Sequence, residues 1–529
     1  MLDDRSIVKK DTFPLLRQLS LGTLIAMAYL GVSLVVAGRP GLPLDDSWIH
    51  QTLARNLAES GGMWINPGEV NPVTTSFLWT IVLFLGYKLG VNYLLWAYVM
   101  GAGCYLGSAW LVSRLSLALF PERRSLALFS ATLFLLDWHM AWAAVSGMET
   151  MLFVMISVLL IYLGVRPEMP RPIVLGLVGA LAMLSRPEGA VLFVLILAFL
   201  CARRIEEASR KLHSSYQGLF RRLVQSAKLS LRYIMPAVLA FMLLAVPYWL
   251  FNFLGSGSPL PSTFNAKHAY YSQESFTVYG ALLYLYRAAV ALLVGPLLFL
   301  LPGVLYIVAI SVARALRKST EEEGENSFLL PLPLAWVAVL WIMYFVWLPV
   351  PHLHHGRYLM PSMPFLLVLG LAGSAELAGR LKAQTWLPRL RAVVLAFSTM
   401  WLIVGATVYG CNVKLIQDNQ IAAALWIKDN TALDSEVATH DIGAMGYFSE
   451  RRLLDTAGLI TRELSNSPGD EETVISMMRQ RDVNMLVLFE SWHPWALKNK
   501  HFTELARLGG KCLFFQSPEE MQVLRFTGE

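Results

Sequence analysis

Two adjacent aspartates follow the first long apolar run of the 529-residue chain. Asp45 and Asp46 open an amphipathic stretch at 45–50, shortly after an apolar run at 19–37. Carboxylates beside a membrane are costly unless they act on a partner, so the pair predicts a catalytic or ligand-binding site. One aspartate could instead cap the helix expected at 48–57, although a single cap does not need two of them.

Other polar residues beside apolar runs could take part in the same chemistry. A carboxylate can remove a proton from a hydroxyl group, whereas arginine and lysine can hold a phosphate. Arg357, together with Lys267 and His355, would supply the phosphate-binding cations. The candidate substrate-binding residues are Glu149, Arg186, Glu188, Lys267, His268, His355 and Arg357.

Each of these residues also has a structural interpretation. Glu149 is either an acceptor-binding or metal-binding residue, or an interfacial charge at the start of a span. Arg186 and Glu188 can simply pair with each other, and Arg357 can be a snorkelling residue at a span end. The histidines within 352–355 are either a metal site or a solvated turn. A divalent metal therefore stays open as a cofactor.

The composition shows which elements must position these residues. Hydrophobic residues make up 56% of the chain and charged residues 15%, which is typical of a polytopic membrane protein and not of a soluble domain. The mean hydropathy is +0.51. The net charge of +6 does not indicate a nucleic-acid partner, because the lysines and arginines lie between apolar runs as orientation signals.

Apolar runs and basic loops predict the topology. Basic residues at 5–17 place the N-terminus in the cytoplasm, and the first apolar run lacks a cleavage site, so we expect a retained helix. The later basic clusters all lie inside if two spans separate consecutive clusters. These clusters are 123–124, 166–171, 203–232, 314–318 and 380–391. The expected spans are 19–37, 92–119, 126–142, 148–165, 172–185, 188–202, 233–251, 283–313, 329–349, 358–378 and 392–412. This gives about eleven transmembrane helices, with the aspartate pair and the C-terminus outside.

One apolar segment, at 77–90, does not fit this series. As a further span it would place all later basic clusters outside, whereas as an interfacial helix on the outer leaflet it leaves the pattern intact. The segment is short for a span and follows Pro72 and the polar residues at 74–76. We therefore predict an interfacial helix, with a plain span as the alternative.

The composition changes to that of a soluble domain near residue 412. We expect a membrane domain at 1–412 and a small extracytoplasmic α/β domain at 413–529. Its strands are predicted at 436–439, 452–455 and 485–489, and its helices at 420–429 and 471–481. The four cysteines have no metal-binding or redox spacing, and a Cys411–Cys512 disulfide outside the membrane stays open.

Several short motifs, taken together, resemble the GT-C class of glycosyltransferases, which use polyprenyl-phosphate-linked sugars. The resemblance is nearest to the bacterial branch that includes the mycobacterial terminal arabinofuranosyltransferases. The motifs are Asp45-Asp46-Ser47-Trp48-Ile49, Ala54-Arg55-Asn56-Leu57-Ala58-Glu59, Asn66-Pro67-Gly68-Glu69, Thr75-Ser76-Phe77-Leu78-Trp79-Thr80, Ser146-Gly147-Met148-Glu149-Thr150, Arg186-Pro187-Glu188-Gly189, Arg357-Tyr358-Leu359-Met360-Pro361 and Asp441-Ile442-Gly443-Ala444-Met445-Gly446-Tyr447-Phe448.

The resemblance implies interfacial helices in the first outer loop and a catalytic base at Asp45 or Asp46. The first acidic residue plays this part in similar enzymes, which favours Asp45, with Asp46 orienting the acceptor or a metal. The chain departs from the family at Val73-Thr74-Thr75, where a glycine and a tyrosine are usual, and this leaves the acceptor preference open. The resemblance also implies the cytoplasmic (inner) membrane of a bacterium.

The chemistry of such a donor needs only one base. The leaving group is already a stabilised phosphate anion, so the general acid of ordinary glycoside hydrolysis is not required. We therefore expect a glycosyltransferase that moves a sugar from a polyprenyl-phosphate donor to a glycan, lipid or protein acceptor on the extracytoplasmic face. The alternative is a lipid or sugar transporter. Transporters usually place polar residues near the midplane and carry internal repeats, whereas here polar residues gather on one face and no repeat is visible.

Overall fold

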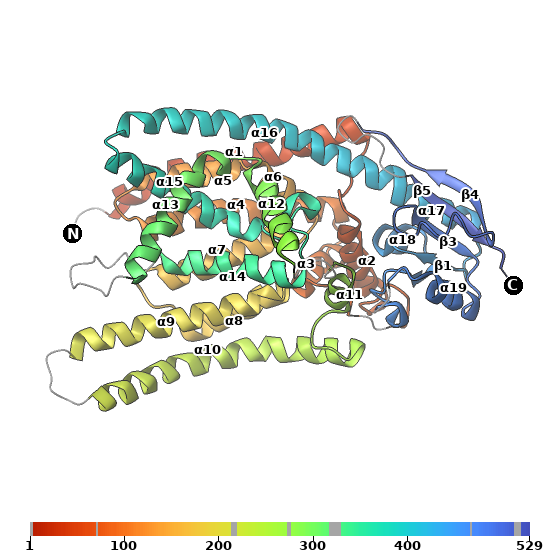
Figure 1. Cartoon of the computed structure of the whole chain (residues 1–529), viewed down its shortest axis with the longest axis horizontal. Helices are drawn as coiled ribbons and strands as arrows, with labels where there is room; N and C mark the ends of the chain where they lie inside the picture. The colour runs from red at the N-terminus through yellow and green to blue at the C-terminus, as the bar shows by residue number, and fades with distance from the viewer. Residues whose placement is uncertain are drawn as a thin grey trace.

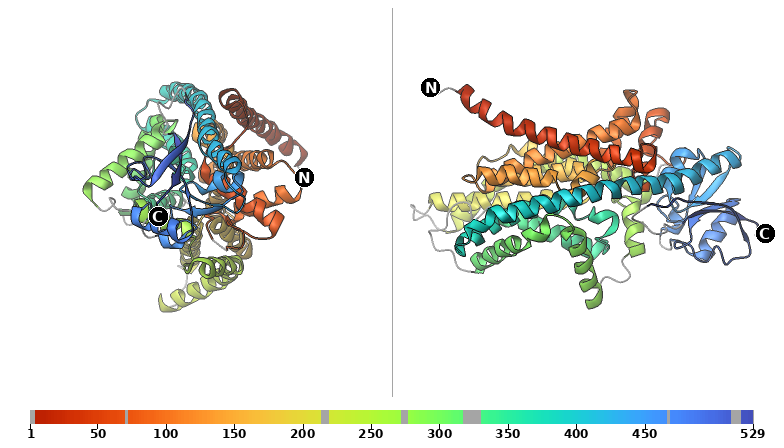
Figure 2. Two further views of the ribbon diagram at one scale, coloured as in Figure 1. Left: turned by 90° about the vertical axis from the view of Figure 1, so that its right-hand side faces the viewer. Right: turned by 90° about the horizontal axis from the view of Figure 1, so that it is seen from above.

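The chain folds into a long bundle of helices with a small mixed α/β domain at one end (Figures 1 and 2). The computed structural model describes residues 4–69, 72–212, 219–271, 277–316, 330–465, 468–512 and 520–528. The N-terminus and the C-terminal domain lie at opposite ends of the bundle (Figure 1). The predicted fold class, a helical membrane protein with a C-terminal α/β domain, is confirmed.

The helices of the bundle follow the apolar runs closely. Within the described residues, six helices are long and apolar enough to cross a membrane, or seven if the bent pair α5 and α6 is one span. Five further apolar helices are shorter, so the expected eleven spans stay a prediction. The helices up to the last span are α1 (Asp4–Ala37), α2 (Asp45–Ser60), α3 (Phe77–Lys88), α4 (Tyr93–Leu119), α5 (Arg124–Leu135), α6 (Trp138–Ala144), α7 (Thr150–Val165), α8 (Pro172–Ser185), α9 (Glu188–Leu212), α10 (Leu219–Ser256), α11 (Ser262–Tyr271), α12 (Val278–Leu293), α13 (Leu297–Leu316), α14 (Pro331–Trp347), η3 (Leu353–Gly356), η4 (Met360–Ser362), α15 (Met363–Arg380), η5 (Gln384–Trp386) and α16 (Leu387–Ile416).

Two predicted spans are broken in the structure. The run at 283–313 was expected to be one helix, but it forms α12 and α13 with a break that contains Gly295 and Pro296. Proline has no N–H to donate and disfavours a helical residue before it, which explains the break. The run at 126–142 is α5 and α6, bent by 60°. Asp137 causes this second helix start, because its side chain accepts from the backbone N–H of His139.

Helix α3 has the length expected of an interfacial helix. It contains 12 residues, or about 18 Å of helix, whereas the hydrocarbon core is about 30 Å thick. Ser76 caps it by accepting from the backbone N–H of Trp79 at 3.4 Å. The helix packs beside α2, and α2 in turn packs against the C-terminal domain.

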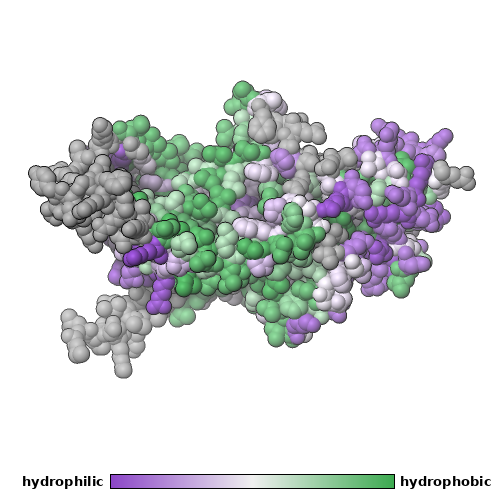
Figure 3. Space-filling view, turned by 90° about the horizontal axis from the view of Figure 1, so that it is seen from below, coloured by the Kyte–Doolittle hydropathy of each residue, from purple (hydrophilic) through white to green (hydrophobic). Residues whose placement is uncertain are grey.

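Basic residues of α9 and α16 contact neighbouring parts of the bundle. Arg203 donates to the backbone carbonyl of Arg166 at 2.7 Å, and the Arg391 guanidinium lies 5.5 Å from the ring centre of Phe129. Figure 3 shows hydrophobic side chains over the middle of the bundle and hydrophilic ones over the C-terminal domain. The orientation of the bundle in the membrane stays a prediction.

The C-terminal domain is built on a five-stranded sheet in the order β2-β1-β3-β5-β4. β1 pairs in parallel with β2 and β3, while β5 runs antiparallel to β3 and β4. The three predicted strands and both predicted helices are confirmed, whereas β4, β5 and α18 were not predicted. The elements are η6 (Gln417–Ile421), α17 (Ala422–Asn430), β1 (Glu436–Thr439), α18 (Ile442–Phe448), β2 (Arg452–Asp455), η7 (Arg462–Leu464), α19 (Glu471–Gln480), β3 (Met485–Phe489), β4 (Phe502–Leu508) and β5 (Met521–Phe526).

This domain shares its core with the membrane domain. Ile49 and Leu53 of α2 are buried in one apolar cluster with Val437, Ile442 and Met445. A disulfide between Cys411 of α16 and Cys512, beyond β4, joins the same two parts. Helix α2 and the C-terminal domain are therefore packed as one unit.

Candidate functional site

The aspartate pair occupies the first turn of α2 and does not cap it. The N-cap residue is Leu44, and α2 has no side-chain capping hydrogen bond. Asp45 instead accepts from the backbone N–H groups of Gly443 and Ala444, at 2.8 and 2.7 Å, and so caps α18 of the C-terminal domain. A negative charge at a helix N-terminus is stabilised by the helix dipole.

Helix α2 also holds the other end of α18. Arg55 donates to the backbone carbonyls of Tyr447 at 2.7 Å and Gly446 at 3.4 Å, and its guanidinium lies 4.3 Å from the ring centre of Tyr447. The close approach requires Gly443, because a Cβ there would lie 2.2 Å from the backbone oxygen of Asp45. Asp45 at one end of α18 and Arg55 at the other thus hold this helix on α2.

The pKa of the Asp45 carboxyl is raised well above its usual value. Burial is the main cause and the nearby Asp441 adds to it, while the two backbone N–H groups act in the opposite direction. Burial also raises the pKa of Asp441 to about 6, although Gln420 donates to its carboxylate at 3.0 Å. Two acids of elevated pKa therefore meet where the C-terminal domain joins α2.

Asp46 has different surroundings, because it binds two cations. Lys267 Nζ lies 3.1 Å and Arg357 Nη2 lies 2.5 Å from Asp46 Oδ2. Burial alone would raise the pKa of Asp46, but Lys267 and Arg357 outweigh it and hold the pKa well below its usual range. The structure thus brings Asp46 together with two cations that lie 221 and 311 positions later in the sequence.

Arg357 is buried but only partly satisfied. Its Nη2 donates to Asp46 and to the Tyr358 hydroxyl, the latter at 3.1 Å, and the side chain is 4% exposed. Its Nε and Nη1 find no acceptor among the residues that the structure describes. Buried donors are almost always paired in native proteins, so these two nitrogens are available to a ligand that accepts hydrogen bonds.

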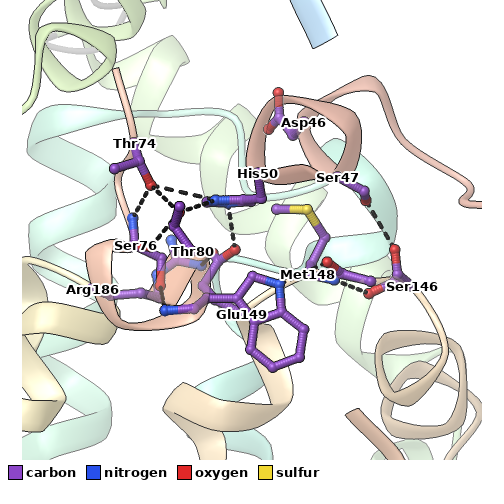
Figure 4. A network of polar contacts seen from close by, with 12 residues as sticks. Asp46, Ser47, His50, Thr74, Ser76, Thr80, Ser146, Met148, Glu149 and Arg186 are labelled. Carbon is purple, nitrogen blue, oxygen red and sulfur yellow. Dashed lines mark hydrogen bonds and ion pairs between the residues drawn. The ribbon is translucent and has the colours of Figure 1, made fainter. Parts of the chain in front are cut away.

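A second buried network lies below this cluster (Figure 4). Arg186 donates from Nη1 to Glu149 at 3.1 Å, and from Nη2 to Glu188 at 3.3 Å and to the Tyr344 hydroxyl at 2.6 Å. His50 Nε2 lies 3.5 Å from Glu149. Figure 4 shows the ring of His50 also reaching the threonine side chains beside α3, Thr74 and Thr80, at 3.3 and 3.2 Å. The three predicted residues of this group are thus one network.

The remaining candidates lie around these two groups. His268 Nδ1 is 2.9 Å from the backbone oxygen of Trp347. His355 turns away from Arg357, since its Nε2 is 2.9 Å from Asn412 and its ring lies against Trp138. His354, which was not selected, lines the site instead. Within the described residues no three His, Cys, Asp or Glu side chains form a metal-binding group.

Two cavities meet at the cation cluster. The junction cavity, about 240 Å³, lies between α2, α11 and the C-terminal domain, and Asp45, Asp46, His440 and Asp441 are among its lining residues. The Arg357 cavity, about 60 Å³, is lined by residues of the second network and by aromatic side chains: Thr75, Glu149, Arg186, Pro187, Glu188, Thr263, Phe264, Lys267, His268, Met343, Tyr344, Trp347, Leu348, Arg357 and Tyr358. Lys267 and Tyr358 line both cavities, so two ligands could meet there.

Sequence reasoning missed several residues of the site. His50 lies one helical turn after Asp46, so the spacing could have revealed it. Asp441 opens one of the motifs but received no role. Tyr358 stands in another of the motifs but also received no role. Tyr344 and Gln420 carried no signal, because isolated tyrosines and amides occur throughout the chain.

Comparison with known proteins agrees with this architecture. The model of a family described as "Domain of unknown function (DUF8728)" matches residues 412–523. The chain matches no curated protein sequence. Solved structures with the same arrangement share 14% identity with it.

Structures of two of these proteins have TM-scores above one half. The apo oligosaccharyltransferase of Archaeoglobus fulgidus has a TM-score of 0.53, covering 89% of this chain and 69% of its own. ArnT from Cupriavidus metallidurans bound to undecaprenyl phosphate has a TM-score of 0.52, covering 95% and 97%. The arabinofuranosyltransferase AftD from Mycobacteria scores 0.46, covering 96% and 40%. The chain therefore has the fold of the GT-C class of membrane glycosyltransferases.

Proposed function

We propose that the protein is an integral-membrane glycosyltransferase that moves a sugar from a polyprenyl-phosphate donor to an acceptor hydroxyl on the extracytoplasmic face. One observation carries the proposal. Arg357 and Lys267 share a single carboxylate, and two guanidinium nitrogens of Arg357 have no acceptor in the described part of the chain. A buried cluster with surplus positive charge is suited to a phosphate group.

The donor phosphate would bind at the Arg357 cavity. There it would accept from Arg357 Nε and Nη1 and share Lys267 with Asp46, which stabilises the charge that develops on the departing phosphate. Glu188 lines the same cavity, and its Oε2 has no partner among the described residues, so it could accept a hydroxyl of the donor sugar.

The lipid chain of the donor also has suitable space. Helices α12 to α15 surround an apolar cavity of about 890 Å³, whose lining includes Leu285, Leu301, Val308 and Ala338. Helix α14 contributes to this cavity and to the Arg357 cavity, so a lipid could reach from one to the other along it. ArnT, which has the same fold, was solved with undecaprenyl phosphate bound.

Asp45 is the better candidate for the base. A base works best when its pKa lies near the operating pH, and the pKa of Asp45 is raised while that of Asp46 is lowered by its two cations. Each Asp45 oxygen accepts one backbone N–H and keeps a lone pair for an acceptor hydroxyl. Asp46 would orient Lys267 and Arg357 until the donor binds.

Charge and redox chemistry support the extracytoplasmic face in this proposal. Under the positive-inside rule the basic segments 203–232 and 380–391 would be cytoplasmic, which supports a site on the opposite face. The Cys411–Cys512 disulfide also fits an oxidising compartment. A reporter fused after Glu529 should therefore respond as extracytoplasmic, and one inserted within 203–232 as cytoplasmic. A cytoplasmic response after Glu529 would contradict this orientation.

The proposal is tested by replacing Asp45 with Asn, which keeps the shape but cannot take a proton. In the purified protein supplied with lipid-phosphate sugars and candidate acceptors, Asp45→Asn should lower turnover by about 10² to 10⁴, the range for loss of a general base. Donor binding should persist, because the lost contact is with the acceptor. Asp418→Asn, a carboxylate on η6 that pairs with Lys414, is the matched control. Turnover of Asp45→Asn at the wild-type rate would place the chemistry elsewhere.

A further inference from the structure

The junction cavity continues into an open groove on the outer surface. The groove is about 400 Å³ in volume and lies between α16, η6 and the loop after β3. Ile416, Gln420, Phe489 and Trp492 line both spaces. A molecule longer than one sugar could thus extend from Asp45 past these four residues to the surface.

The walls of this path combine flat aromatic rings with hydrogen-bonding groups. Phe489 and Trp492 offer the rings, and the His440 ring packs against that of Trp492 with ring centres 3.3 Å apart. Gln420 is only 9% exposed, and its Oε1 has no partner among the described residues. The buried Nδ1 of His440 also has no partner among the described residues. Buried polar atoms of this kind indicate a ligand that supplies hydrogen bonds.

This combination suits a carbohydrate. A sugar ring has an apolar C–H face that packs on an aromatic ring and hydroxyl groups at its edge that bond amides and carboxylates. Asp441, next to Gln420 in the junction cavity, could accept such hydroxyls. The hydroxyl to be glycosylated would then lie nearest Asp45.

Other acceptor classes fit the path less well. A lipid chain needs apolar walls, and these surround the cavity between α12 and α15 instead. An extended peptide commonly binds by adding to a free strand edge, but β3, which leads into the groove, is the central strand of the sheet. The edge strands are β2 and β4, and neither contributes a residue to the groove.

We propose that the acceptor is a glycan chain, with its terminal sugar in the junction cavity and its preceding sugars along Phe489 and Trp492 in the open groove. This inference rests on the proposed function and adds the chemical class of the acceptor. The C-terminal domain is then the part of the protein that recognises the acceptor.

The test measures binding of defined probes to the purified full-length protein in detergent. The probes are linear hexasaccharides of arabinofuranose, mannose and glucose, the matching disaccharides, an unstructured hexapeptide and undecaprenyl phosphate. We expect at least one hexasaccharide to bind more tightly than its disaccharide, because only the longer chain reaches the groove. Trp492→Ala should weaken that binding at least about fivefold, whereas Trp492→Phe keeps a flat ring and should retain most of it.

Controls separate this inference from the proposed function. Trp386→Ala removes a 63% exposed tryptophan just before α16 and should change nothing. Undecaprenyl phosphate binding should be unchanged in Trp492→Ala, which also shows that this variant is folded. The inference fails if donor binding stands but no hexasaccharide binds, if the peptide binds instead, or if Trp492→Ala binds the hexasaccharide as the wild type does. If the wild type does not bind undecaprenyl phosphate, the proposed function itself is contradicted.

Discussion

Two buried arginines of this protein, Arg186 and Arg357, bind carboxylates in neighbouring networks that differ in charge balance. Arg186 faces two carboxylates, Glu149 and Glu188, and also the Tyr344 hydroxyl. Arg357 shares the single carboxylate of Asp46 with Lys267 and leaves two nitrogens without a described partner. The first network supplies its own counter-charges, whereas the second lacks one.

This difference separates a structural role from a ligand-binding role. A buried cation that is fully paired within the protein contributes to stability, and removing it leaves uncompensated buried charge. A buried cation in surplus stays costly until an anion arrives, and this cost favours ligand binding. Replacement of Arg186 should therefore lower the stability of the protein, whereas replacement of Arg357 should weaken ligand binding.

The largest effect is expected for Arg186→Met, which keeps much of the side-chain volume but removes the charge. Glu149 and Glu188 would then be buried without a cation, and the free energy of unfolding should fall by about 3–5 kcal/mol. A lower midpoint of denaturant unfolding in detergent would show this loss. Arg357→Met is the matched control and should lower the midpoint much less. Equal losses in both variants would remove the distinction between the two networks.

A smaller effect is expected for donor affinity in Arg357→Ala. Loss of a charge-assisted hydrogen bond should weaken binding of undecaprenyl phosphate by about 1.5–3 kcal/mol. Arg357→Lys should recover only part of this, because lysine lacks the planar fork of donors. Arg389→Ala, at the basic end of the bundle, serves as the control. Equal donor affinity of the wild type and Arg357→Ala would withdraw the phosphate site.

The smallest effect is expected for Asp46→Asn, which tests whether Asp46 competes with the donor phosphate for the two cations. Asp46 competes with the donor phosphate for Lys267 and Arg357, and its side chain is 26% exposed, so the competition is partly screened. Its removal should tighten binding of undecaprenyl phosphate by about 0.5–1 kcal/mol. Weaker binding by Asp46→Asn would mean that Asp46 holds the cations in place for the phosphate and does not compete with it.

Much of the membrane domain could be predicted because lipid imposes simple rules on a sequence. Backbone groups in a membrane must be bonded within their own helix, so apolar runs of sufficient length become helices. The prediction for 283–313 was wrong because hydropathy outweighed the local signal of Gly295 and Pro296. The run has a single charged residue, Arg287, but proline still interrupts the hydrogen-bond pattern.

The C-terminal domain contains elements that local sequence patterns do not predict. Helix α18 has seven residues, two of them Gly443 and Gly446, and its sequence alone gives little reason for a helix. It is stable because Asp45 and Arg55 of α2 bind its two ends from almost 400 positions away. Strand β4 was missed because it is largely exposed at the edge of the sheet and lacks a clear apolar alternation.

The sequence alone determined that this is a multi-span helical protein, that acids and bases gather beside its spans, and that a small α/β domain follows them. These properties depend on composition and local pattern, and water and lipid act on them residue by residue. Only the tertiary structure decided that Asp45 faces α18 and Asp441 while Asp46 faces Lys267 and Arg357. Adjacent residues of a helix point about 100° apart, so neighbours in the sequence meet different partners once distant segments pack around them.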